Sequence, residues 1–227
     1  MSQWKPVGNG IEYIQRRERT SGIEDWVTTV RVDLNKAQLH LRYTPDSPQF
    51  VRNWFAAVDP DVVINAGFFT PENTTAGLLV ANGKRYGQTY KGFGGMFAIR
   101  DGKAQLQWLA RTPYLADPRI TEALQSYPML VLDGQLVNGI PEDGTRNRRS
   151  FIGIDREGRV VLGVCQSPVW TITDLASYLL SNPLYNLRSV LNLDGGSSSG
   201  IWIRGVPDAL LLDSLNQVPA VITINSR

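Results

Sequence analysis

The chain has 227 residues and a net charge of +2, with only one cysteine and one histidine. These counts exclude an internal disulfide, a cysteine-based zinc site and any site with two or three histidine ligands. A charge so close to zero also excludes a broad basic face for nucleic acid, and no run of about 18 apolar residues is present to span a membrane. Acid–base chemistry must therefore fall mainly on carboxylates, hydroxyls and arginines.

The length and composition favour one domain. Domains average about 150 residues, and a chain with 42% hydrophobic and 19% charged residues is typical of a globular protein. No linker, low-complexity stretch or repeat of fixed period divides the sequence. We expect a single α+β domain over residues 1–227, a β-rich mixed sheet with few helices. Residues 1–60 form its β-rich N-terminal part, and residues 61–227 carry the motifs.

Short β-patterned runs separated by turn-forming pairs make up most of the chain. Asn82-Gly83, Asp101-Gly102, Asp133-Gly134 and Glu157-Gly158 each lie between apolar runs, which is the pattern of a β-hairpin. The expected strands, in chain order, are residues 26–33, 39–43, 62–64, 78–80, 96–100, 129–132, 151–155, 159–164, 190–193, 201–204 and 221–224.

Two helices are expected among these strands. The first, Gln49–Val58, has four large apolar residues on one face. The second, Thr173–Ser181, is the clearer of the two, with Thr173 as its N-cap, Asp174 in its first turn and an apolar stripe along its length. The pair Asn182-Pro183 should end it.

Two apolar runs end abruptly in segments that combine polar residues with glycine. Residues 62–64 (VVI) are followed by residues 65–69 (NAGFF), and residues 191–193 (LNL) by residues 194–199 (DGGSSS). In both, a polar side chain follows a buried strand and a permissive loop comes next. Mixed α/β proteins often place sites there, because the strand holds the residue and the loop opens space.

Asp194 is the strongest candidate for chemistry, as an acid, a base or a nucleophile. The N–H groups of the two glycines after it and the hydroxyls of the three serines could surround an anionic oxygen. The alternative is a tight turn in which Asp194 caps its own loop. Three serines after a buried run make us favour the functional interpretation.

The segment 65–69 offers one amide and two aromatic rings. Asn65 is either a hydrogen-bond partner for a ligand or a buried amide that binds backbone, and the pattern favours neither. Phe68 and Phe69 are expected in the core.

Three arginines, Arg146, Arg148 and Arg149, lie in a charged loop expected over Pro141–Arg149. A guanidinium group presents a planar fork that matches phosphate or carboxylate, although such clusters are usually solvated loops. Arg149 is nearest the following strand, and we expect it to point inward.

The single histidine and the single cysteine do not fit a catalytic role. His40 lies within a strand pattern with no nucleophile nearby, so a Ser-His-Asp triad is not expected. Cys165 lies in an apolar strand, which is typical of an inert core thiol. Trp170 is also expected in the core.

Taken together, these segments resemble the phosphodiester glycosidase family, which has animal and bacterial members. The motifs keep the family's order from about Val62 to Ile224: residues 65–69 are similar to its first motif, 94–102 to its next strand and hairpin, 149–155 to its Arg-Thr-Ala-Ile-Gly segment, and 191–198 to its Asn-Leu-Asp-Gly-Gly-Gly-Ser signature. Ser150-Phe151 replaces Thr-Ala, Ser197 replaces the third glycine, and the cysteine-rich extensions of the animal members are absent.

The resemblance implies hydrolysis of a sugar-1-phosphodiester at the anomeric C–O bond, giving free sugar and a phosphomonoester. The implied catalytic residues are Asp194, as base or nucleophile, with Arg149 and Asn65. The implied substrate-binding residues are Asn192, Gly195, Gly196, Ser197, Ser198, Gly67 and Phe68. Only weak candidates, Glu72 and Asp174, exist for a second carboxylate. No cofactor is required, although Asp194 and nearby oxygens could hold a hard divalent cation.

Two other functions stay open. One is a non-catalytic glycan or sugar-phosphate-binding module that uses the same residues, and the other is a polysaccharide or cell-wall glycan hydrolase on the same fold. The expected partner is a small-molecule or glycan sugar phosphate, and a homo-oligomer is compatible with the sequence. The N-terminal residues lack the apolar segment of a signal peptide, and the resemblance implies an extracytoplasmic protein whose signal has been removed.

Overall fold

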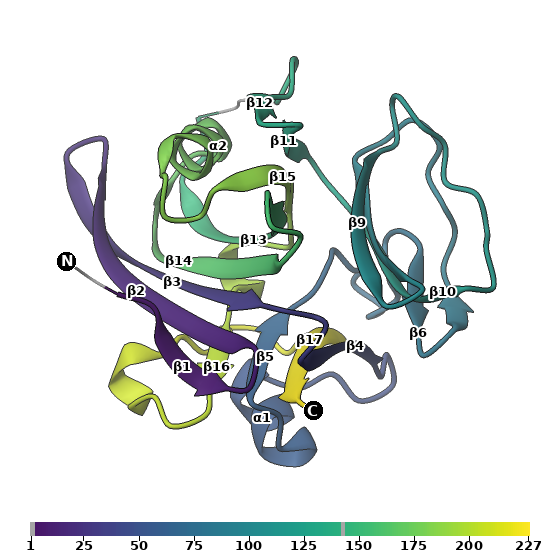
Figure 1. Cartoon of the computed structure of the whole chain (residues 1–227), viewed down its shortest axis with the longest axis horizontal. Helices are drawn as coiled ribbons and strands as arrows, with labels where there is room; N and C mark the ends of the chain where they lie inside the picture. Colours follow the sequence, from purple (N-terminus) through teal and green to yellow (C-terminus); the bar gives the residue numbers. More distant parts are fainter. Residues whose placement is uncertain (1–2, 142–143) are drawn as a thin grey trace.

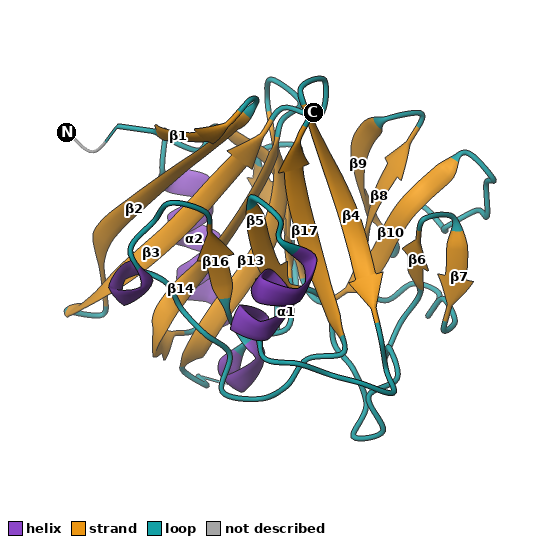
Figure 2. Cartoon of the chain, turned by 90° about the horizontal axis from the view of Figure 1, so that it is seen from below, coloured by secondary structure: helices purple, strands orange, loops and turns teal. Residues whose placement is uncertain are grey.

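The computed structural model describes residues 3–141 and 144–227, and β-strands are its dominant element (Figures 1 and 2). The strands form three sheets, with the orders β1-β2-β3-β14-β13-β15-β11-β12, β7-β6-β10-β8-β9 and β16-β5-β17-β4. Figure 2 shows the four-stranded sheet between the other two.

Each sheet draws its strands from distant parts of the chain. The eight-stranded sheet consists of β1 (Lys5–Gly8), β2 (Ile11–Thr20), β3 (Ile23–Val32), β14 (Val160–Trp170), β13 (Asn147–Asp155), β15 (Leu187–Asn192), β11 (Met129–Leu132) and β12 (Gln135–Leu136). The five-stranded sheet consists of β7 (Lys84–Tyr86), β6 (Leu79–Ala81), β10 (Ile120–Ser126), β8 (Gly95–Arg100) and β9 (Lys103–Trp108). The four-stranded sheet consists of β16 (Ile201–Ile203), β5 (Val62–Asn65), β17 (Ala220–Ser226) and β4 (Ala37–Tyr43). The helical elements are α1 (Val51–Val58), α2 (Ile172–Ser181) and the single 3₁₀ turns η1 (Gly196–Ser198) and η2 (Asp208–Leu210).

The predicted α+β fold with few helices is confirmed, but the sheets are not mixed. Within the described ranges, every strand pairing is antiparallel. The four predicted hairpins all form, because their Gly-containing pairs adopt the turns that join adjacent antiparallel strands. Apolar runs such as β5 are central strands buried on both faces, which antiparallel sheets also allow when other layers cover them.

The first 60 residues are built into the same sheets as the motif-bearing part. β3 pairs with β14 in the eight-stranded sheet, and β4 pairs with β17 in the four-stranded sheet. One core cluster accordingly draws apolar side chains from β4, β5, β8, β13 and β17. The sheets that carry the site therefore depend on strands from both ends of the chain.

Outside the predicted hairpins, several strands lie where no strand was expected, notably β2 and β10. β2 is rich in charged residues and buries only Ile11, Ile14 and Thr20, so its alternation is weak. β10 contains Glu122, which is 1% exposed. That carboxylate accepts hydrogen bonds from the N–H groups of Leu41 and Asn82 and contacts His40 Nδ1 at 3.0 Å. The hydrogen bonds from neighbouring strands allow this acid to be buried, so β10 lacks the alternation of apolar and polar residues that predicts a strand.

Both helices begin at a residue other than the one predicted. The N-cap of α2 is Thr171 rather than Thr173: its Oγ1 accepts from Asp174 N at 3.1 Å, and the Asp174 carboxylate accepts from Thr171 N at 3.4 Å. α1 begins at Val51 because Gln49 pairs instead with Val218 in an isolated bridge. The buried face of α2 covers the eight-stranded sheet (Figure 1).

Cys165 is fully buried in β14, as predicted, and burial raises the pKa of its thiol well above the usual value. The native protein is therefore expected to show essentially no reaction with a thiol reagent such as DTNB over minutes at pH 8. In guanidinium chloride, one thiol per chain should react. Rapid labelling of the native protein would contradict this burial.

Candidate active site

The two motif strands end side by side although they belong to different sheets. β5 lies in the four-stranded sheet and β15 in the eight-stranded one. The side-chain Nδ2 of Asn65 donates to the backbone oxygen of Asp194 at 2.7 Å, and Asp194 N donates to Ala66 O at 3.2 Å. The structure thus brings together the two segments that the sequence singled out.

Asn65 is 1% exposed, and its amide is occupied by protein groups. Besides its bond to Asp194, its Oδ1 accepts from Ser150 Oγ at 2.8 Å and from Gly200 N at 3.2 Å. The hydroxyls of Ser150 and Ser199 are 3.0 Å apart and hydrogen-bonded to each other. Of the two interpretations left open for Asn65, the geometry favours a buried amide that ties both ends of the Asp194 loop to β5 and β13.

The carboxyl group of Asp194 is largely buried, and burial raises its pKa from 3.8 to about 6. Hydrogen bonds from the Ser198 side chain and from Gly195 N oppose this shift by stabilising the carboxylate. At pH 7 the charged form therefore predominates. A carboxylate with this pKa is a stronger base than an ordinary aspartate and is ready to accept a proton near neutral pH.

The loop after Asp194 is packed tightly against its surroundings. A Cβ on Gly195 would lie 2.9 Å from the backbone oxygen of Arg148, and Gly196 has φ +59°, a conformation that favours glycine. Ser197 is tied to the neighbouring loop, since its Oγ accepts from Asn216 Nδ2 at 2.8 Å. Ser198 is 5% exposed and faces Asp194. The predicted loop residues thus shape the surroundings of one carboxylate.

Gly195→Ala is expected to destabilise the protein by about 1–3 kcal/mol, because the new methyl group meets the Arg148 carbonyl and must displace the loop. Under the function proposed below, activity should fall with it, since Asp194 moves with the loop. Urea unfolding and a steady-state assay of that function measure the two effects. Gly102→Ala, in the β8–β9 hairpin, is the control for activity, which should stay unchanged. A Cβ there would meet no atom within 4 Å, so its cost comes only from the backbone φ of +73°.

A cavity of about 290 Å³, which we call the polar cavity, lies next to the Asp194 loop. Its wall residues Arg149 and Asn147 are the side chains nearest to Gly195 and Gly196, whereas Asp194 itself is not part of the wall. The wall includes Phe68, Tyr127, Thr145, Asn147, Arg149 and Asn192. Asn192 is 3% exposed, and its Nδ2 donates to the backbone oxygens of Tyr127 and Leu193, both at 2.8 Å. Its buried Oδ1 has no hydrogen-bond partner within the described part of the chain. The two backbone bonds of its Nδ2 fix the orientation of Asn192 in this wall.

Arg149 is held against the same cavity by the end of β14. Its Nε donates to Trp170 O at 3.0 Å, and its Nη2 donates to Thr145 O at 2.7 Å. The expected loop is in fact strand from Asn147 onward, because these residues pair with β14, and residues 142–143 of that segment lie outside the described residues. Arg149 points inward as predicted, and its charge borders the cavity.

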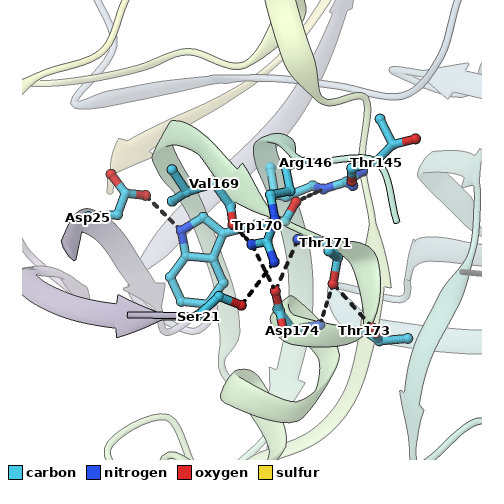
Figure 3. A network of polar contacts seen from close by, with 10 residues as sticks. Ser21, Asp25, Thr145, Arg146, Val169, Trp170, Thr171, Thr173 and Asp174 are labelled. Atoms are coloured by element: carbon cyan, nitrogen blue, oxygen red, sulfur yellow. Dashed lines mark hydrogen bonds and ion pairs between the residues drawn. The ribbon is translucent and has the colours of Figure 1, made fainter. Parts of the chain in front are cut away.

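A network of polar contacts fixes the segment that carries Arg149 (Figure 3). Trp170, buried as expected, donates from Nε1 to Asp25 Oδ2 at 2.7 Å. Arg146 donates to Val169 O at 2.6 Å and to Ser21 Oγ at 3.0 Å, and it pairs with Asp174 at 3.5 Å. The start of α2, the β2–β3 turn and the end of β14 therefore hold the arginine side of the cavity together.

Phe68 is 36% exposed, so its expected place in the core is wrong. It lies in the wall of the polar cavity and also in the wall of a larger apolar cavity. Phe69 does pack inside, against the cluster around Trp54 and Val63. The backbone of Gly67 lies close to β10, where a Cβ would be 3.2 Å from Gln125 O, and this close approach sets where Phe68 emerges.

Neither candidate for a second carboxylate is supported. Asp174 caps α2 and pairs with Arg146, while Glu72 lies in an exposed turn. Among residues 3–141 and 144–227, no group of three or more histidine, cysteine, aspartate or glutamate side chains could hold a metal ion. The expectation that no cofactor is needed stays a prediction. No helix in the described ranges has the length and apolar character to cross a membrane.

Several residues of the site were not singled out from the sequence. Tyr127, Thr145 and Asn147 come from segments with no motif of their own, and only the fold brings them to the cavity. Ser150 likewise was not singled out; with Ser199, one of the three serines predicted to matter, it completes the hydrogen bonds around Asn65. For Ser150 a signal existed, since it keeps the hydroxyl of the family's threonine.

Comparison with known proteins identifies the family. Residues 59–224 match the phosphodiester glycosidase family. The chain belongs to this family. The resemblance seen in the motifs is confirmed, and the family is one of glycosidase-type hydrolases. No curated protein sequence matches the chain significantly.

Solved structures share the fold at low sequence identity. The catalytic domain of zebrafish N-acetylglucosamine-1-phosphodiester α-N-acetylglucosaminidase, auto-inhibited by its pro-peptide, is similar with a TM-score of 0.72 and 17% identity, covering 98% of this chain and 85% of that one. A hypothetical protein from Synechocystis is similar with a TM-score of 0.68 and 16% identity, covering 96% of this chain and 62% of that one. A putative exported protein from Burkholderia pseudomallei is similar with a TM-score of 0.61 and 13% identity, covering 91% of this chain and 75% of that one.

Proposed function

We propose that this phosphodiester glycosidase-family protein hydrolyses a sugar-1-phosphodiester at its glycosidic C–O bond and releases free sugar and a phosphomonoester. One arrangement carries the proposal: Asp194, with a pKa of about 6, stands where β5 and β15 meet, beside a cavity walled by Arg149 and Asn192. The catalytic and substrate-binding roles assigned below are part of the same proposal.

The phosphate lies in the polar cavity in this proposal. Arg149 supplies positive charge, and the carbonyls of Trp170 and Thr145 hold its guanidinium in one orientation. A fixed cation stabilises the charge that develops on the leaving phosphate without having to reorganise. Asn192, in the wall of the same cavity, positions the sugar in this scheme.

In the reaction, the bond between the anomeric carbon and the phosphate oxygen breaks, and its electron pair stays on that oxygen. The departing phosphomonoester is a weak base, so protonation by a general acid is not required. Asp194 has two possible roles. As a base, it takes a proton from a water molecule whose oxygen attacks the anomeric carbon; as a nucleophile, it attacks that carbon itself and water later releases the sugar. Inversion or retention of the product anomer, read by NMR, separates the two.

Asn65 acts in this scheme through Asp194. Its bonds to Asp194 O, Ser150 Oγ and Gly200 N fix the loop on which the carboxylate stands. It is therefore a positioning residue in our proposal.

The test uses α-hexose 1-(4-nitrophenyl phosphate) diesters of N-acetylglucosamine, glucose and galactose. Cleavage at the sugar C–O bond yields 4-nitrophenyl phosphate, so colour should appear only after a phosphatase is added. In H₂¹⁸O the phosphomonoester should carry no label. Immediate colour, or label in the phosphomonoester, would show P–O cleavage and overturn the proposal.

The plain 4-nitrophenyl glycosides of the same sugars, each with and without EDTA, are the controls. They should not be cleaved, and EDTA should not slow cleavage of the diesters. Cleavage of the glycosides alone would indicate a glycan hydrolase. Diester binding with no turnover would indicate a binding module.

A further inference from the structure

A second cavity, of about 570 Å³, adjoins the polar one. Its wall includes Phe68, Tyr90, Phe93, Gln125, Ser126 and Tyr127. Phe68 and Tyr127 belong to the walls of both cavities. The two cavities are therefore neighbours that meet at these two side chains.

Aromatic side chains dominate this second wall, which we call the aromatic cavity. The rings of Phe93 and Tyr127 stack with centroids 4.1 Å apart and an interplanar angle of 13°. Phe93 is nevertheless 49% exposed, and Tyr90 is 59% exposed. A contiguous exposed apolar patch beside a polar site is typical of a ligand-binding surface.

The aromatic cavity is held in shape by buried groups. The side chain of Gln125 is 6% exposed; its Oε1 accepts from Tyr90 N at 3.0 Å, and its Nε2 donates to Tyr90 O at 2.8 Å and Phe93 O at 2.9 Å. The segment that carries Tyr90 and Phe93 is thereby fastened to β10. A preformed wall loses little conformational entropy when a ligand binds.

The wall offers few fixed partners for a polar ligand. Its one charged side chain, Lys91, and the hydroxyl-bearing Tyr90 are both exposed to solvent. The amide of Gln125 is used by the backbone of residues 90–93. Ser126 Oγ is buried with no hydrogen-bond partner in the described part of the chain, and it is a single hydroxyl. A pyranose ring would gain few direct hydrogen bonds from this wall, and any hydroxyl turned toward the rings would lose water without compensation. An apolar ring or branched alkyl group would bury apolar surface against the aromatic side chains without that cost.

We propose that the aromatic cavity binds the alcohol portion of the phosphodiester, and that this alcohol is an apolar group of ring size or larger. The inference rests on the proposed function, which places the phosphate in the polar cavity. The alcohol is esterified to that phosphate, so it lies within reach of the cavity that Phe68 and Tyr127 share with the phosphate site. The protein would thus select its substrates partly by the group beyond the phosphate.

Binding of two phosphomonoesters tests the cavity without turnover. Benzyl phosphate should bind about 10–100-fold more tightly than methyl phosphate by calorimetry, since the benzyl ring buries apolar surface that the methyl group lacks. Phe93→Ala and Tyr90→Ala should each reduce this ratio severalfold. Leu115→Ala, at a leucine that is 79% exposed and lies outside the aromatic cavity, is the matched control and should keep the ratio. Equal affinities, or no binding of benzyl phosphate, would overturn the inference.

Turnover of two diesters of one sugar, with benzyl and methyl phosphate, separates this inference from the proposed function. A higher kcat/KM for the benzyl diester that falls in Phe93→Ala supports both. Hydrolysis of both diesters at equal rates overturns the alcohol preference and leaves the hydrolysis standing. Tighter binding of benzyl phosphate with no hydrolysis of either diester supports the cavity and overturns the reaction.

Discussion

Asp194→Asn is expected to lower kcat/KM for a sugar-1-phosphodiester by about 10²–10⁴-fold, because the amide can neither take a proton from water nor attack the anomeric carbon. An asparagine keeps the size of the side chain, so the loop should remain in place. The phosphatase-coupled assay measures the loss, and binding of a phosphomonoester should persist. Asp46→Asn, at an exposed aspartate outside the site, is the control. Full activity in Asp194→Asn would remove Asp194 from the mechanism.

The pH dependence of the wild-type protein follows from the same carboxyl group. Its pKa is about 6, so kcat/KM should fall below that pH as Asp194 becomes protonated and loses its function as base or nucleophile. The pH profile of the residual activity of Asp194→Asn should not show this fall at acidic pH.

The same substitution should stabilise the protein at alkaline pH. The native pKa of about 6 lies above the ordinary 3.8, so the folded state favours the protonated acid. The stabilising contribution of that acid is complete below about pH 3.8 and is lost as the pH rises through 6. The buried charge then costs at most about 3 kcal/mol. Urea unfolding should therefore show Asp194→Asn to be the more stable protein at pH 8, with the difference shrinking toward pH 4.

Asn65→Ala is the second substitution with a large expected effect, a loss of about 3–5 kcal/mol in the free energy of unfolding. It removes the acceptor of Ser150 Oγ and Gly200 N and the donor to Asp194 O, all in a buried place. Unsatisfied buried groups account for most of the cost. Activity should fall as well, because the Asp194 loop loses its tether to β5.

Urea unfolding and the coupled assay, run below the melting range of the variant, separate the two effects. Asn138→Ala replaces an exposed asparagine and should change stability by no more than about 0.5 kcal/mol. Asn65→Asp keeps an oxygen for Ser150 and Gly200 but cannot donate to Asp194 O. Wild-type stability in Asn65→Ala would mean that these hydrogen bonds do not hold the loop.

Local chemistry made much of the fold readable from the sequence. The pairs Asn82-Gly83, Asp101-Gly102 and Asp133-Gly134 determine tight turns through backbone conformations that few residues adopt, so the strands beside them could be placed. The strands that were not predicted have sequences without a clear apolar pattern. β2 is mostly polar, and β10 contains Glu122, a buried acid whose hydrogen-bond partners lie in another sheet. Their pattern becomes clear only when the neighbouring strands are present.

By itself, the sequence determined the family, the two motifs that end β5 and β15, and the burial of Cys165. These depend on runs of adjacent residues, whose turn preferences and apolar character act locally. Tertiary structure alone decided three features. The Asn65 amide hydrogen-bonds to the Asp194 loop, Phe68 is exposed, and an aromatic cavity adjoins the polar one. The reason is physical: these features arise where two sheets and distant loops meet, and a side chain's partners there come from residues far away in the chain.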